Sequence, residues 1–233
     1  MAETNLDLAG LERHVKIRRD SRAKRMALRL DPANRCVHLV LPRFASPRKA
    51  QHFIDEHRQW VFDRISELPE FIPFVDGEVI PVLGREVEIV VRYDEHRKST
   101  KIELQDHILL VETNLEDYEP RIKRFLKNLA REYLTDMLEE KTSNLTRQSK
   151  KIQIRDTKSR WGSCSADGNI SLSWRLIFAP LNAMDYVVAH EAAHLEHMDH
   201  SKRFWNLCEK LCVSYKDGKS WMRKHGYTLH RYG

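Results

Sequence analysis

The chain has 233 residues, with 40 Lys and Arg against 34 Asp and Glu and a formal net charge of +6. This length suits one large domain or two small ones with a real core, and the charge permits contact with nucleic acid or other anions without requiring it. No apolar run approaches the roughly 18 residues of a membrane span, and no apolar signal segment opens the chain. We therefore expect a cytoplasmic protein without membrane contact.

The N-terminal portion is predicted to be β-rich. Residues 1–10 are expected to be disordered, and 11–115 to form this portion with one helix. Alternating apolar residues predict two or three strands within 13–42, joined by a turn at 31–34. Pro47 is expected to open a helix that runs to Leu68, followed by a loop over 69–81. Further strands are predicted at 85–93, 100–105 and 108–113.

A basic cluster crosses the first of these strands. Only Glu12 and Asp20 oppose its charge. Its members are Arg13, Lys16, Arg18, Arg19, Arg22, Lys24, Arg25 and Arg29. The cluster is either a solvated strand face or a docking surface for a phosphate backbone or an acidic partner. No aromatic residue interleaves it, so the sequence does not predict a stacking platform for single strands.

Residues 116–233 are predicted to form an α+β portion that contains the chemistry. A long helix is expected over 116–148, and strands at 151–156 and 170–174 flank a Gly168-Asn169 turn. The four cysteines have no CxxC spacing. Reduced structural thiols are therefore expected.

The most informative motif is His190-Glu191-Ala192-Ala193-His194, which reads HExxH. Residues four apart lie one above the other on a helix, so the two histidines can point their imidazoles at one metal ion. Glu191 lies about 100° around the helix, within reach of a water molecule held by that ion. The motif predicts a zinc site with Glu191 as the catalytic base.

The neighbouring residues indicate a helix. Asn182 is expected to cap its start, with Asp185 three residues later as in a capping box. Met184, Val188 and Leu195 share a face directed toward the core.

A third ligand requires the chain to turn back. If the helix continued, His200 would lie about 15 Å further along its axis. The helix must therefore end near 196–199, so that His200 can join the pair. Asp199 or Ser201 would cap a following helix that buries Phe204, Cys208 and Leu211. His197 is the rival third ligand, and three histidines with water in the fourth position form an open, catalytic zinc site.

The Arg160-Trp161-Gly162-Ser163-Cys164-Ser165 segment predicts a β-hairpin beside the zinc helix. In zinc peptidases such a strand edge binds the extended substrate by β-augmentation. Ser163 is therefore a candidate substrate-binding residue, and Trp161 and Cys164 are interpreted as core residues. Arg160 could stabilise an oxyanion or bind an acidic substrate group, and Tyr186 or Tyr215 could help to polarise the scissile carbonyl.

The C-terminal motifs closely resemble the YgjP-like metallopeptidase family. The resemblance covers roughly residues 150–225 and is looser in the N-terminal half. It rests on Arg160 to Cys164, Leu172, Pro180, Asp185 to Glu191, His194-Leu195, His200-Ser201 and Phe204-Trp205. The family is similar to the SprT-type and WLM-type zinc proteases, some of which degrade proteins crosslinked to DNA. A departure is Ala192, where the family usually places Leu.

The resemblance implies a zincin-like α+β portion, with the HExxH helix against a small sheet. It also implies His190, His194 and His200 as zinc ligands and Glu191 as the base of a peptidase that cleaves proteins or peptides. Two alternatives stay open. One is a nucleoside triphosphate pyrophosphatase, an activity sometimes described for this family. The other is a DNA- or protein-binding module with structural zinc.

Overall fold

The computed structural model describes residues 6–8 and 10–233, and it has the expected α+β fold. The prediction of disorder for 1–10 falls in part on residues 1–5 and 9, which lie outside the described residues. The chain forms two compact units, Met1–Glu70 and Phe71–Gly233. The division falls before the strands at 85–113, which the sequence grouped with the N-terminal portion. These strands lie in the second unit because their apolar residues share one core with the helices that follow.

In the first unit, a three-stranded sheet carries two helices. Its strands are β1 (Val15–Asp20), β2 (Ala27–Asp31) and β3 (Cys36–Pro42), in the order β1-β3-β2. β3 runs parallel to β1 and antiparallel to β2. A short 3₁₀ turn, η1 (Pro32–Asn34), joins β2 and β3. The predicted helix over 47–68 is instead two helices, α1 (Pro47–Glu56) and α2 (Arg58–Ser66), because His57 leaves helical geometry at φ −107° and ψ 10°.

The core of this unit lies between the sheet and the helices. Val37, Leu39 and Leu41 alternate along β3 and are fully buried, as are Ile54 and Val61 on the helices. Val37, Leu39 and Leu41 lie on the strand face that meets the helices and so account for this layer, while Cys36 and Val40 on the opposite face are buried as well.

The second unit begins with a four-stranded sheet in the order β4-β5-β7-β6. The strands are β4 (Val79–Val82), β5 (Arg85–Tyr93), β6 (Lys101–Gln105) and β7 (Ile108–Thr113). The three predicted strands are confirmed, and β4 lies at the end of what was predicted to be a loop. The following helix, α3 (Glu119–Thr142), is shorter than expected. Its fully buried residues recur every four positions: Ile122, Leu126, Ala130, Leu134 and Leu138.

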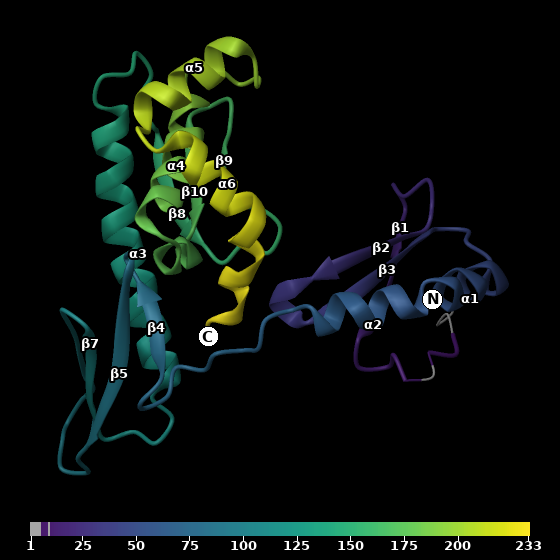
Figure 1. Cartoon of the computed structure of the whole chain (residues 1–233), viewed down its shortest axis with the longest axis horizontal. Helices are drawn as coiled ribbons and strands as arrows, with labels where there is room; N and C mark the ends of the chain where they lie inside the picture. Colours follow the sequence, from purple (N-terminus) through teal and green to yellow (C-terminus); the bar gives the residue numbers. More distant parts are fainter. Residues whose placement is uncertain (1–5, 9) are drawn as a thin grey trace. The chain divides into compact units, whose positions relative to one another are not determined.

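A small second sheet supports the HExxH helix. Its strands are β8 (Lys151–Arg155), β9 (Gly162–Cys164) and β10 (Asn169–Ser173), in the order β8-β10-β9. The antiparallel pairing of β9 with β10 is the predicted hairpin. The helix α4 (Leu181–Ala193) contacts this sheet, α3 and both C-terminal helices (Figure 1).

The remaining elements complete the second unit. They are η2 (Trp174–Phe178), α5 (Lys202–Leu211), α6 (Tyr215–His225) and η3 (Gly226–Arg231). Across the described part of the chain, none of the helices combines the length and the apolar character that a membrane span needs.

Candidate active site

The helix α4 directs its histidines away from the core. Met184 and Val188 are fully buried and Leu195 nearly so, which confirms the predicted core face. The predicted cap was wrong: α4 follows Pro180, has no side-chain cap, and contains both Asn182 and Asp185. A helix with eight of its 13 residues buried takes its position from packing rather than from a cap.

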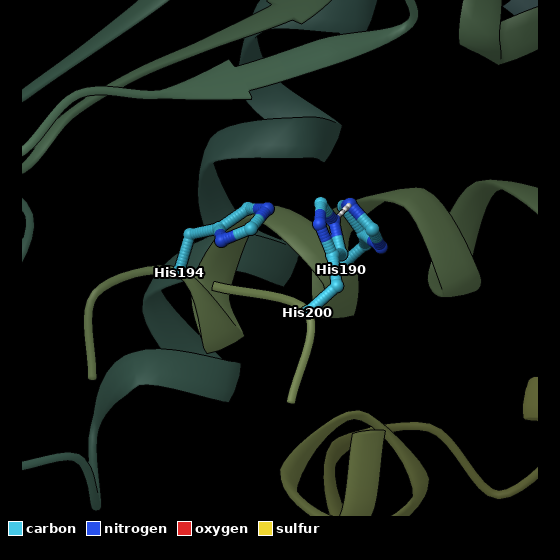
Figure 2. Close-up of side chains that lie close together, drawn as sticks. All are labelled: His190, His194 and His200. Atoms are coloured by element: carbon cyan, nitrogen blue, oxygen red, sulfur yellow. Dashed lines mark hydrogen bonds between the residues drawn. The ribbon is translucent and has the colours of Figure 1, made fainter. Parts of the chain in front are cut away.

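The chain turns back directly after α4. The helix ends at Ala193, earlier than expected, and Ala193 O accepts the backbone N–H of His197 at 3.0 Å. Ser201 then occupies the N-cap position of α5, although its side chain makes no capping hydrogen bond. This reversal brings His200 back to the helix, with its Nε2 3.3 Å from His190 Nε2. Figure 2 shows the rings of His190, His194 and His200 gathered in one place.

The three histidines could hold one metal ion. Each offers a ring nitrogen, and the three atoms lie within 4.8 Å of one another. His194 Nδ1 pairs with the backbone oxygen of His197 at 3.0 Å, so Nε2 is its free nitrogen. His197 therefore contributes a carbonyl to this arrangement, and its imidazole is not part of the group. A ligand histidine whose other nitrogen is fixed by a carbonyl is the usual arrangement around protein metals.

The surroundings favour the neutral form of two of these imidazoles, those of His190 and His194. Burial, followed by the neighbouring His194 and His200, lowers the pKa of His190 to about 4. Burial also lowers the pKa of His194. Metal binding requires neutral imidazoles. The other ring nitrogen of His190, Nδ1, is buried and has no hydrogen-bond partner among the described residues. Three imidazole nitrogens are a donor set that protein metal sites commonly use.

Glu191 lies beside the histidines and is 5% exposed. Burial raises the pKa of its carboxyl to about 8, and the charge of Arg160 opposes that rise. Gly162 on β9 packs directly against it: a Cβ at that position would lie 2.5 Å from Glu191 Oε1. The sequence predicted Glu191 but not the role of Gly162, which allows β9 to approach the carboxylate.

A cavity of about 350 Å³ opens on His190 and Glu191. Its other walls include Trp161, Gly162, Tyr186, Lys219, Met222 and Arg223. Most of these residues are apolar, and the two cations come from α6. Lys219 Nζ donates to Tyr215 Oη at 2.9 Å and lies 3.8 Å from the centroid of the Trp205 ring. Of α6, the sequence predicted a role only for Tyr215, which does not line the cavity. It missed Lys219, Met222 and Arg223, because no local motif marks them.

Of the three candidate substrate-binding residues, one lines the cavity and two do not. Tyr186 lines the cavity, with its ring 5.9 Å from that of His190. Ser163 pairs with Ser171 across the hairpin and does not line the cavity. Arg160 is exposed just before β9 and also lies outside the lining, although its charge acts on Glu191. Trp161, expected only in the core, both packs on the core and lines the cavity.

A buried carboxyl group beside a candidate metal site is the arrangement that metal-dependent hydrolases use. Residues 24–225 match the family model described as "YgjP-like, metallopeptidase domain". The chain belongs to the YgjP-like metallopeptidase family, and a metal ion is implied by that membership. Protein or peptide is correspondingly the substrate class of the family.

The crystal structure of the metallopeptidase zymogen of Pyrococcus abyssi abylysin is 30% identical, with a TM-score of 0.35. That similarity covers 39% of this chain and 93% of the other. No curated protein matches the chain.

Proposed function

We propose that this protein is a zinc-dependent peptidase in which His190, His194 and His200 hold the metal and Glu191 is the catalytic base. The observation that carries the proposal is the convergence of three histidine nitrogens beside a buried carboxylate, at the wall of an open cavity. When bound, zinc would act as a Lewis acid that lowers the pKa of water and polarises a carbonyl oxygen.

Glu191 moves the proton. Its carboxylate accepts a proton from the attacking water and then delivers it to the leaving amine. Burial favours this role, because a carboxylate removed from water takes up a proton more readily. Gly162 keeps the carboxylate in place by packing against it without a side chain of its own.

The strand β9 binds the substrate. It is an edge strand of its sheet, and its first residue lines the cavity. An extended peptide can therefore add to this edge and lie across the site. Tyr186, in the cavity wall, is placed to contact the substrate near the scissile bond, and the charge of Arg160 acts from outside the cavity.

A pyrophosphatase is the second candidate function. Lys219 and Arg223 place two positive charges in the same cavity, and phosphate groups would pair with them as readily as carboxylates. The two reactions would use the same base, so substrate comparison is needed to separate them.

A substrate screen tests the proposal. Zinc-loaded wild type and Glu191→Gln are offered unfolded casein, casein bound to DNA, and nucleoside triphosphates. We expect wild type to cleave casein, chelation to abolish cleavage, and Glu191→Gln to retain zinc while losing about 100-fold or more in rate. Equal proteolysis by the variant would disprove the role of Glu191. Hydrolysis of nucleotides alone would establish the second candidate instead.

A further inference from the structure

The first unit contains a cavity of about 730 Å³ whose walls carry several cations. Two loops form most of it, one between β1 and β2 and the other between β3 and α1. Lys49, near the start of α1, completes the wall. All of these residues belong to Met1–Glu70, so the cavity is a property of that unit alone.

The topology of the sheet brings the two loops together. β1 and β3 are parallel and end in register, with Asp20 opposite Pro42. The loops that follow β1 and β3 therefore leave from the same end of the sheet. Arg19, the penultimate residue of β1, fixes the second loop: its guanidinium donates to the carbonyls of Arg43 at 2.9 Å and Ala45 at 3.4 Å. The strand pairing and the Arg19 hydrogen bonds therefore hold the two loops that form the cavity.

The walls are positively charged and lack compensation. Lys24, Arg25, Arg43 and Lys49 are exposed, and no acidic residue belongs to the described lining. In the part of the chain that the structure describes, none of these four makes an ion pair. Two members of the basic cluster, Lys24 and Arg25, therefore line the cavity without an acidic partner. Another member, Arg18, instead pairs with Asp20 at 3.8 Å. Four uncompensated cations around one hollow create a local site for anions.

An aromatic side chain lies in the same cavity. Phe44 is 88% exposed, and the guanidinium of Arg43 lies 5.3 Å from its ring centroid. An aromatic ring left in solvent among cations is available to a planar partner. The sequence predicted no stacking platform here because Phe44 follows the basic cluster by 15 positions. The pairing of β1 with β3 brings the ring to the cluster.

We propose that this cavity binds single-stranded nucleic acid, with phosphates on the four cations and a base stacked on Phe44. Exposed cations beside an aromatic platform are how proteins bind single strands without reading their sequence. A duplex keeps its base faces stacked and could not use the ring. An acidic peptide could pair with the cations but would leave Phe44 without a stacking partner.

Fluorescence anisotropy with the full-length, zinc-loaded chain tests this assignment. The probes are labelled dT20, labelled rU20, a 20-base-pair DNA duplex and polyglutamate, so that DNA, RNA and protein ligands are distinguished. We expect dT20 or rU20 to bind more tightly than the duplex or polyglutamate. The affinity should fall with salt at a slope of roughly −2 to −3, since each of about four phosphate contacts contributes about −0.7.

Matched variants assign the binding to this cavity. Phe44→Ala should weaken single-strand binding about tenfold with an unchanged salt slope, and Phe44→Trp should restore it. Arg43→Glu/Lys49→Glu should weaken binding by tenfold or more and flatten the slope. The control Arg92→Glu/Lys98→Glu makes the same change in net charge at exposed positions of the second unit, and should have little effect.

Crosslinking keeps the test independent of variant stability. Ultraviolet irradiation of wild type with an iodouracil-containing strand should attach the strand to the peptide that contains Phe44. Equal losses in the cavity and control variants would overturn the proposal, because binding would then follow net charge alone. So would tighter binding of the duplex or polyglutamate, or crosslinks that fall elsewhere.

Discussion

Among the residues that the structure describes, two groups bring three metal-binding atoms within 4.8 Å of one another, and one of the two has the features of a site. His190, His194 and His200 form the first group, and Asp31, Cys36 and His38 form the second. The first opens on a cavity and has a carboxylate beside it. The second lies on the hairpin of β2 and β3, where Asp31 and Cys36 are register partners.

The difference lies in what else the donors do. Asp31 accepts hydrogen bonds from the backbone N–H of Asn34 at 3.1 Å and from its side-chain amide at 2.6 Å. It also contacts His38 Nε2 at 3.1 Å. These hydrogen bonds hold the turn between β2 and β3, so the Asp31 carboxylate already has partners within the protein. Closely spaced metal-binding atoms therefore do not by themselves make a catalytic site. The atoms must not already be used in hydrogen bonds that hold the fold together, and they must face space that a substrate can enter.

Removal of one histidine gives the largest expected effect. His200→Ala should weaken zinc binding by more than the roughly 10- to 100-fold typical of changes around a ligand, and should abolish activity. Zinc affinity is measured by competition with a chelating dye. His197→Ala is the matched control, because only its backbone carbonyl contributes. An equal loss in both variants would contradict the choice of His200.

A methyl group on β9 should impair catalysis without affecting the metal. In Gly162→Ala the new Cβ would meet Glu191 Oε1 at 2.5 Å, so the carboxylate must shift. A displacement of about 1 Å can cost up to about 100-fold in rate. Steady-state kinetics and zinc content measured together test this, with Ser163→Ala as the control on the same strand. A variant with normal rate would show that Glu191 needs no fixed position.

Charge in the cavity should set substrate preference. Arg223 lines the cavity from α6, so Arg223→Glu should lower kcat/KM for acidic peptides relative to neutral ones by about fivefold. Lys224→Glu changes the same charge at the neighbouring exposed position, which is not in the cavity lining. Paired fluorogenic peptides that differ only in one Glu or Gln would measure the ratio. An unchanged ratio would remove Arg223 from substrate binding.

The smallest effect is expected in the second group. His38→Ala should leave zinc stoichiometry at one per chain and lower the free energy of unfolding by at most about 1 kcal/mol, because the Asp31–His38 pair is partly exposed. Metal analysis and urea denaturation are the measurements. A fall in zinc content would show that the hairpin also holds metal, and that the second group is a site after all.

Local patterns predicted the parts of the site that follow from helix geometry. The HExxH spacing, the core face of Met184 and Val188, and the need for a reversal before His200 all depend on residues close in sequence. The contributions of Gly162 and Arg223 do not, since they depend on how β9 and α6 pack against α4. The grouping of the strands at 85–113 with the second unit likewise follows from a shared core. Phe44 is a similar case, because only the parallel pairing of β1 with β3 brings it to the basic residues.

Anomalous diffraction at the zinc edge, on crystals grown with zinc, tests the central claim most directly. We expect one peak, about 2.0–2.1 Å from a ring nitrogen of each of His190, His194 and His200, with Glu191 beside it and not bound to it. A peak that lacks His200, or one held instead by Asp31, Cys36 and His38, would contradict it.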